Sequence, residues 1–171
     1  MASVKSRNIQ YYVEGDIEKK LLDVLKARLG CIRPGKVDKL NAVTQKITDV
    51  RLRTLSPGTM VVLVFDTDRE DVEILKENIK RLKESPSVSE VVLIPQVPDL
   101  EAELVRSCDI KKIQELLNSR SRKDAKGDLT HVTNLDQKLR EHRFDINRFW
   151  RGEPAWPYQD IENQAERVKL V

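Results

Sequence analysis

The sequence has only two cysteines, Cys31 and Cys108, in 171 residues, and they are far apart in the chain. Neither belongs to a Cys-x-x-Cys pair or a Cys/His spacing, which argues against a zinc site held by thiolates. A protein with this cysteine usage is expected in a reducing, cytoplasmic compartment, with each thiol packed as a small hydrophobic group. The two histidines, His131 and His142, are too isolated to indicate a metal site.

The sequence also lacks any apolar run near the ~20 residues that cross a bilayer, and residues 1–10 lack the apolar core of a signal peptide. Its net charge is only +3, from 31 Lys and Arg against 28 Asp and Glu. This mild excess excludes a histone-like protein that binds nucleic acid through bulk charge, so a phosphate site must come from local clustering. There is no Gly-x-x-x-x-Gly-Lys-Ser/Thr loop, the phosphate-binding loop of ATPase motors.

What the sequence does contain is an alternation of short apolar runs and longer amphipathic stretches, which is typical of βα units. Strands are predicted at residues 9–13, 37–43, 60–65 and 88–94, and helices at 16–29, 44–55, 70–82 and 100–107. This order predicts a Rossmann-like α/β fold, with a twisted, mostly parallel sheet of about four strands and helices on both faces.

The pattern changes after Asp109. Short helices are predicted at 110–117, 135–142 and 161–168, with a basic flexible loop at 119–127 and a Trp/Pro-rich patch at 149–157. Trp150 and Trp156 are predicted to pin the tail onto the domain, with stacking on nucleic-acid bases as the alternative. We therefore expect an α/β domain over residues 1–108 and a C-terminal helical and basic extension over 109–171, packed on the same domain.

Acidic residues directly follow two of the predicted strands. Glu14 follows the first strand, and Asp66 and Asp68 follow the most apolar one. Ligands of open α/β sheets bind beyond the carboxyl ends of the strands, so these carboxylates converge if the two strands are neighbours. Hard divalent cations such as Mg²⁺ bind oxygen ligands and need only two or three carboxylates. The alternative is that Asp68 caps a helix beginning near Glu70.

These residues resemble the Toprim (topoisomerase-primase) domain, in which one apolar strand ends in Glu-Gly and a later one in Asp-x-Asp. The matching segments are YVEGDIE (residues 12–18) and VLVFDTD (residues 62–68), and the resemblance covers roughly residues 8–107. It is closer to the small RloB-like and OLD-nuclease-like Toprim proteins of mobile-element and phage defence than to full topoisomerases. Those branches often carry another acid in a Pro-containing loop that opens a helix, and Glu101 in PDLE (residues 98–101) matches that position.

The resemblance implies that Asp66 and Asp68 hold Mg²⁺ or Mn²⁺, while Glu14 ligates the metal or acts as general base or acid. A second metal would use Glu18 or Glu101. A divalent cation assists phosphodiester cleavage because it neutralises a phosphate oxygen and lowers the pKa of an attacking water. Without metal, clustered carboxylates repel one another, so their pKa values are expected to be raised.

The basic segment is the expected phosphate-binding partner of these acids. Between residues 106 and 151, twelve Lys or Arg stand against seven Asp or Glu. The residues expected to bind nucleic acid are concentrated in the predicted loop: Arg120, Arg122, Lys123 and Lys126. Lys126 is also a candidate catalytic residue, because a lysine beside Gly127 can approach a phosphate and stabilise charge in the transition state. The alternative is a solvated loop without a ligand.

Together these features predict a Mg²⁺- or Mn²⁺-dependent enzyme that cleaves phosphodiesters in DNA or RNA, a small nuclease in mobile-element defence with a separate ATPase subunit as a further partner. The second hypothesis is a non-catalytic Toprim-like module that binds nucleic acid or an ATPase partner. The third is a small-molecule phosphotransfer or receiver-like domain, although the absence of a lysine at the end of a late strand argues against a phospho-acceptor. No membrane partner is expected.

Overall fold

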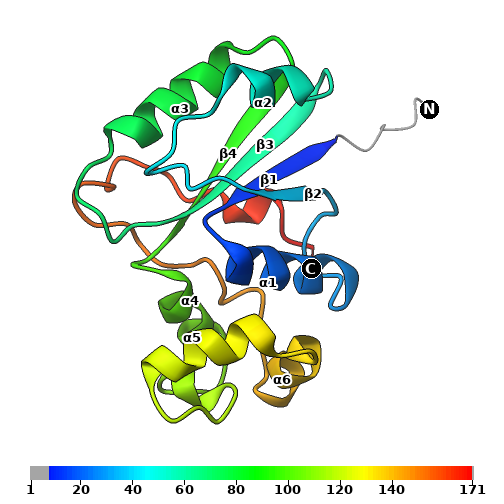
Figure 1. Cartoon of the computed structure of the whole chain (residues 1–171), viewed down its shortest axis with the longest axis vertical. Helices are drawn as coiled ribbons and strands as arrows, with labels where there is room; N and C mark the ends of the chain where they lie inside the picture. Colours follow the sequence, from blue (N-terminus) through cyan, green and yellow to red (C-terminus); the bar gives the residue numbers. More distant parts are fainter. Residues whose placement is uncertain (1–7, 171) are drawn as a thin grey trace.

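A single parallel sheet with helices on both faces forms the centre of the computed structural model, which describes residues 8–170 (Figure 1). The strands lie in the order β2-β1-β3-β4, with bounds β1 (Ile9–Val13), β2 (Lys36–Lys39), β3 (Thr59–Asp66) and β4 (Val88–Gln96). All three strand pairings are parallel. The predicted α/β class and the four-stranded, helix-covered sheet are confirmed. The stretch searched for a signal peptide lies largely outside the described residues.

The helices divide between the two faces of the sheet and its lower end. Their bounds are α1 (Asp16–Ala27), α2 (Asp49–Thr54), α3 (Glu73–Glu84), α4 (Leu100–Ser107), α5 (Arg122–His131) and α6 (Leu135–Glu141), with 3-10 turns η1 (Ile113–Glu115) and η2 (Ala165–Arg167). Helices α2 and α3 cover one face and α1 the other, while α4, α5 and α6 gather below the strands (Figure 1). None of the helices within residues 8–170 has the length and apolarity that a bilayer crossing requires.

Strand β3 is buried along almost its whole length because both of its faces are covered. Its even-numbered residues from 60 to 64 pack into the core on the α1 side, and its odd-numbered residues from 61 to 65 pack against α2 and α3. The core on the α1 side also contains residues from the second half of the chain, including Leu129, Leu139 and Trp150. The C-terminal extension therefore shares a hydrophobic core with the sheet.

The C-terminal tail is not the helix predicted at residues 161–168; only the short turn η2 forms there. The reason is that its backbone groups bond to other parts of the chain. The Gln164 backbone N–H donates to the Leu93 carbonyl at 2.9 Å, and the Val168 carbonyl accepts from the Arg33 backbone N–H at 2.8 Å. These hydrogen bonds attach the tail to β4 and to the segment after α1.

The segment between β2 and α2 also departs from the sequence prediction. The predicted strand 37–43 is shorter, and the predicted helix 44–55 is reduced to α2. The buried Asn78 of α3 explains the irregular part. Its amide donates to the carbonyls of Ala42 (2.9 Å) and Gln45 (2.7 Å), and its oxygen accepts from the Ile47 backbone N–H. These bonds occupy backbone groups that a longer helix would need.

The predicted helix 110–117 is also reduced, because only the turn η1 forms there. The Glu115 carboxylate accepts hydrogen bonds from the backbone N–H groups of Lys111 and Lys112, which closes the chain into a tight turn.

The two tryptophans have different environments. Trp150 is 1% exposed and its ring lies 4.7 Å from that of Phe149, so its predicted packing role is confirmed. Trp156 is 70% exposed, so the prediction that it pins the tail is wrong. Two residues later the buried Tyr158 makes that contact instead, with its ring 6.3 Å from that of Phe65.

We expect Trp150→Ala to lower the free energy of unfolding by about 3–5 kcal/mol, because it leaves a large cavity in the shared core. Trp156→Ala is expected to change it by no more than about 0.5 kcal/mol, because that side chain is already in solvent. Urea unfolding followed by circular dichroism measures both changes. Similar losses in the two variants would contradict the difference in burial.

Candidate acidic site

Three carboxylates meet at the carboxyl ends of the two central strands. Glu14 follows β1, Asp66 ends the neighbouring β3, and Glu18 lies in the first turn of α1. One carboxylate oxygen from each residue lies within 4.8 Å of the other two. Because β1 pairs with β2 on one side and β3 on the other, this is a topological switch point, where open α/β sheets bind ligands.

The acids of this cluster are crowded and largely shielded from water. Burial raises the pKa of Asp66, and a hydrogen bond to Glu14 together with the Glu14 charge raises it further. Burial also raises the pKa of Glu18 to about 7, with repulsion from Glu14 and Glu101 adding to the effect. A set of oxygen ligands that repel one another in this way fits a hard divalent cation such as Mg²⁺, whose charge would offset the repulsion.

Glu101 borders this cluster. It lies in the first turn of α4, and its negative charge contributes to the raised pKa of Glu18. The Lys126 ammonium lies 3.5 Å from a Glu101 carboxylate oxygen. The structure therefore brings three of the five predicted metal ligands to one place. Glu101 lies near enough for its charge to act on Glu18, and it pairs with the candidate catalytic lysine.

Asp68 is the predicted ligand that stays apart. Its side chain is exposed, and it is not one of the three acids that meet within 4.8 Å. Its charge acts instead on Tyr158, whose pKa is raised first by burial and then by Asp68. The alternative that Asp68 caps the next helix is also wrong. Helix α3 begins at Glu73, whose backbone N–H donates to the Asp71 carboxylate at 3.0 Å.

The loop predicted at residues 119–127 is wrong, because most of it belongs to helix α5. The Ser121 hydroxyl accepts a hydrogen bond from the Asp124 backbone N–H at 3.1 Å, which caps the first turn. Ala125 and Leu129, one turn apart, are the buried residues of the helix. The capping pattern and this spacing were both present in the sequence, but the stretch is so polar that its composition favoured a loop.

Lysine 20 of α1 holds the end of α5 in place. Its ammonium donates to the carbonyls of Leu129 (2.9 Å) and Thr130 (3.2 Å), and also to that of Val132. A cation at the C-terminus of a helix satisfies carbonyls that have no partner within the helix. Lys20 thus fixes α5 to the helix that carries Glu18.

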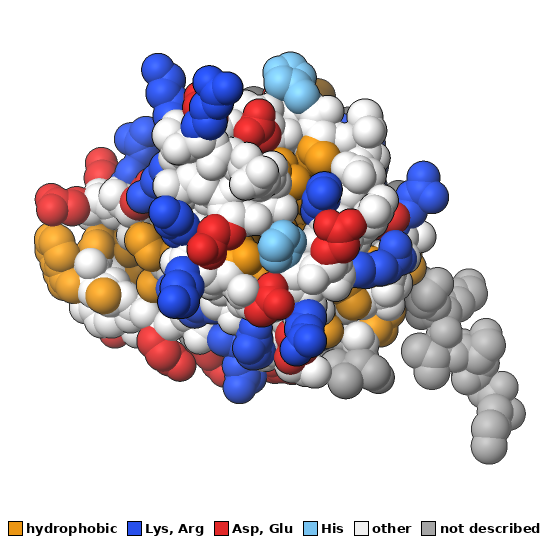
Figure 2. Space-filling model, turned by 90° about the horizontal axis from the view of Figure 1, so that it is seen from below, with side chains coloured by type: hydrophobic (Ala, Val, Ile, Leu, Met, Phe, Trp, Pro, Cys, Tyr) orange, Lys and Arg blue, Asp and Glu red, His pale blue; other side chains and the backbone are white. Residues whose placement is uncertain are grey.

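Helix α5 presents two of the predicted basic residues to the acidic start of α4. Arg122 pairs with Asp99 at 2.9 Å, and Lys126 pairs with Glu101 as described. Arg120 and Lys123 are exposed to solvent. Lys and Arg alternate with acidic residues over this end of the molecule (Figure 2).

A groove of about 430 Å³ runs between α4 and the following segment. Its charged lining residues are Asp99, Glu101, Arg106, Lys112 and Arg122. The groove thus brings Glu101 of α4 and Arg122 of α5 to one surface.

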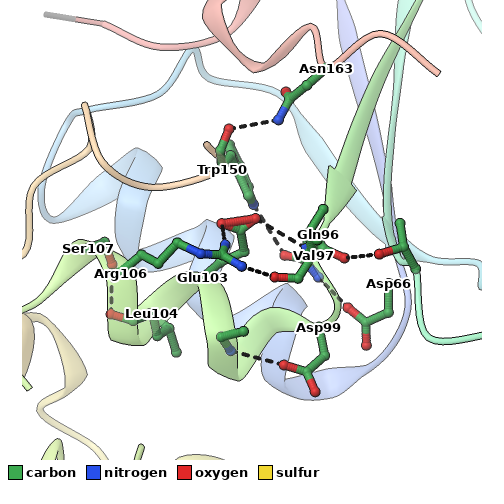
Figure 3. Close-up of polar contacts among 12 residues, drawn as sticks. Asp66, Gln96, Val97, Asp99, Glu103, Leu104, Arg106, Ser107, Trp150 and Asn163 are labelled. Carbon is green, nitrogen blue, oxygen red and sulfur yellow. Dashed lines mark hydrogen bonds and ion pairs between the residues drawn. The ribbon is translucent and has the colours of Figure 1, made fainter. Parts of the chain in front are cut away.

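The sequence analysis missed Gln96, which directly contacts the cluster. Gln96 ends β4 and is fully buried, and its amide nitrogen donates to Asp66 Oδ1 at 2.8 Å (Figure 3). It carries no charge and belongs to neither the Glu-Gly nor the Asp-x-Asp segment. The sequence feature that could have indicated Gln96 was its position at the carboxyl end of β4, the strand beside β3.

We expect Asp66→Asn to raise the melting temperature of the metal-free protein at pH 8 by roughly 2–4 °C, because the crowded, half-buried site disfavours the ionised carboxyl that the unfolded chain prefers at this pH. The gain should shrink toward pH 5. A carboxyl whose pKa is raised in the folded state destabilises the fold only at pH values where the unfolded chain has lost that proton. The cost of Asp66 therefore grows as pH rises, and the variant that removes it gains less at lower pH. Thermal melts in EDTA measure this effect. Asp68→Asn is the matched control and should show no gain; equal gains would contradict the crowding of Asp66.

Comparison of the chain with family models, curated proteins and solved structures found no match. Glu14, Glu18 and Asp66 meet at the switch point of the sheet, Glu101 and Lys126 border them, and Gln96 contacts them from β4.

Proposed function

We propose that this protein is a divalent-metal-dependent phosphodiesterase of Toprim type that cleaves DNA or RNA. The observation that carries the proposal is the meeting of Glu14, Glu18 and Asp66 within 4.8 Å at the carboxyl ends of β1 and β3. Buried carboxylates with raised pKa values are characteristic of sites that bind a cation or move a proton. The Glu-Gly and Asp-x-Asp segments found in the sequence add support.

In this proposal Asp66, Glu18 and Glu14 hold Mg²⁺ or Mn²⁺, and Glu101 extends the site toward a second ion. When bound, the ion neutralises a phosphate oxygen and lowers the pKa of an attacking water. Glu14 directly follows β1 and lies beside Asp66 in the cluster, so it is the residue placed to take a proton from that water. Asp68 contributes charge from the exposed loop after β3.

The substrate side of the proposal rests on the cations beside the groove. Arg122 and Lys126 remain 62% and 57% exposed although each pairs with an acid, so phosphates can still reach them. The exposed Trp156 supplies a ring on which an unpaired base can stack. The two free cysteines support the reducing, cytoplasmic setting that forms part of the proposal.

A second candidate function is a non-catalytic module that binds nucleic acid or an ATPase partner. The ion pair of Lys126 with Glu101 favours it, because it joins a predicted nucleic-acid-binding residue to a predicted metal ligand, and the neighbouring Arg122 is likewise paired, with Asp99. A wild-type protein that binds nucleic acid and Mn²⁺ without cleaving would support this candidate. Cleavage that depends on Glu14 would exclude it.

We expect Glu14→Gln to lower the rate of nucleic-acid cleavage by at least about 100-fold while leaving substrate affinity within about twofold. The change removes a proton acceptor and metal ligand at nearly constant shape. Nicking of plasmid DNA and cleavage of labelled RNA, each with Mg²⁺ or Mn²⁺, measure the rate. Glu84→Gln, at the exposed end of α3, is the control and should keep wild-type activity. Undiminished cleavage by Glu14→Gln would refute the assigned mechanism.

Neutralising the basic residues should affect binding rather than chemistry. Changing Arg120 and Lys123 together to Gln is expected to weaken binding and to reduce the slope of log affinity against log salt by about 0.7–0.9 for each lost phosphate contact. Filter binding at several salt concentrations measures the slope. The matched control changes Lys80 and Lys83 of α3, which lies on the other face of the sheet. If both pairs flatten the slope equally, the α5 end of the molecule is not the binding surface.

A further inference from the structure

A chain of two hydrogen bonds links the C-terminal extension to the acidic cluster (Figure 3). The Trp150 indole N–H donates to Gln96 Oε1 at 3.2 Å, and Gln96 Nε2 donates to Asp66 Oδ1 at 2.8 Å. Trp150 and Gln96 are both buried, at 1% and 0% exposure. Asp66 is therefore contacted by a side chain whose own partner lies 54 residues further along the sequence.

The chemistry of the indole sets the direction of this chain. An indole nitrogen can only donate, so the Gln96 side chain has to turn its oxygen toward Trp150. The Gln96 amide nitrogen then faces Asp66, where it can only donate. A donor suits the carboxylate form of Asp66, which is the form that binds a cation. Without the indole N–H, the amide would be free to turn its oxygen to Asp66 instead.

Trp150 is itself held firmly. Its φ angle is +58°, a conformation that bulky side chains rarely adopt. Its carbonyl accepts a hydrogen bond from the Asn163 amide at 2.8 Å. At Gly152, an added Cβ atom would lie 2.6 Å from Val97 Cβ. Only glycine therefore lets this segment lie so close to the end of β4.

The residues after Gln96 are fixed from the other side by α4. Glu103 is fully buried, accepts a hydrogen bond from the Val97 backbone N–H at 3.2 Å, and pairs with Arg106, which also donates to the Val97 carbonyl. The Gln96 carbonyl accepts from the Thr67 hydroxyl at 2.9 Å. Both flanks of Gln96 are thus immobilised, and its side chain has one orientation that satisfies both partners.

We propose that Gln96 and Trp150 are positioning residues for metal binding, which set the hydrogen-bond direction and the orientation of the Asp66 carboxylate. This inference rests on the proposed function, because it concerns the same acidic site. Partners of metal ligands act in this way in proteins generally, and their loss typically weakens metal binding 10–100-fold. The inference makes the C-terminal extension a part of the site although it supplies none of the three clustered acids.

The test compares Mn²⁺ affinity, measured by isothermal titration calorimetry at one pH, in three single variants and in the double variant of Trp150→Phe with Gln96→Met. Trp150→Phe removes the indole donor and keeps a buried ring, and Gln96→Met removes the donor to Asp66 at similar volume. Phe149→Leu is the matched control, because it disturbs the packing of the same segment without removing a polar atom. Thermal melts in EDTA show that each variant is folded at the temperature of the titration.

We expect Trp150→Phe and Gln96→Met each to weaken Mn²⁺ binding about tenfold or more, and the double variant to be no weaker than Gln96→Met alone, because the two residues act in series. Phe149→Leu should lower the melting temperature and leave the affinity within twofold. An unchanged affinity in Trp150→Phe, or an equal loss in Phe149→Leu, would overturn the positioning role. A wild-type protein that binds no Mn²⁺ would overturn the proposed metal site itself.

A second readout does not need metal. In a proton–nitrogen correlation spectrum the two tryptophans give two indole signals, and Asp66→Asn should move that of the buried Trp150 while leaving that of the exposed Trp156 in place. The shift is expected because Asp66 and Trp150 share one amide. If the Trp150 signal does not respond, the two hydrogen bonds do not form a chain, and the inference fails whether or not the protein binds Mn²⁺.

Discussion

The pairing of β1 with β3 is the constraint on which the acidic site depends. These strands are separated in sequence by α1, β2 and α2, yet their parallel register brings Glu14 and Asp66 to the same edge of the sheet. The apolar residues on both faces of β3 drive this arrangement, because burying them requires a strand on either side and a helix layer above and below. Hydrophobic burial therefore offsets the repulsion between carboxylates that would separate on their own.

The central part of this arrangement follows from the sequence. Alternating apolar runs predicted all four strands, and the position of Glu14 and Asp66 directly after two of them predicted that they would meet. Asp68 shows where this reasoning stops. An Asp-x-Asp spacing places two acids near each other, but β3 ends at Asp66, and the exposed Asp68 acts through its charge on Tyr158 and is not one of the three acids that meet.

The second half of the chain was harder to predict because few of its residues are apolar at regular spacing. Helix α5 buries only Ala125 and Leu129, and its position depends on Lys20, a charged residue of α1 that supplies hydrogen bonds across the sequence. The tail forms no regular helix because its backbone groups bond to distant segments. Gln96 belongs to the same class, since its role depends on what it contacts rather than on its own charge. Such features arise from tertiary contacts, and local sequence patterns carry little of that information.

The position of Trp150 has a consequence for the order in which the molecule is made. A ribosome releases the sheet strands and all the clustered acids well before it releases residues 149–170, and domains begin to fold from the N-terminal side during synthesis. The nascent chain thus has its carboxylates before it has the indole that orients Gln96 and the tail that closes over β4. An acidic site that needs residues 149–170 stays incomplete until that segment has been synthesised. Translation products that stop before Trp150 would then carry the acids without the geometry that residues 149–170 give them.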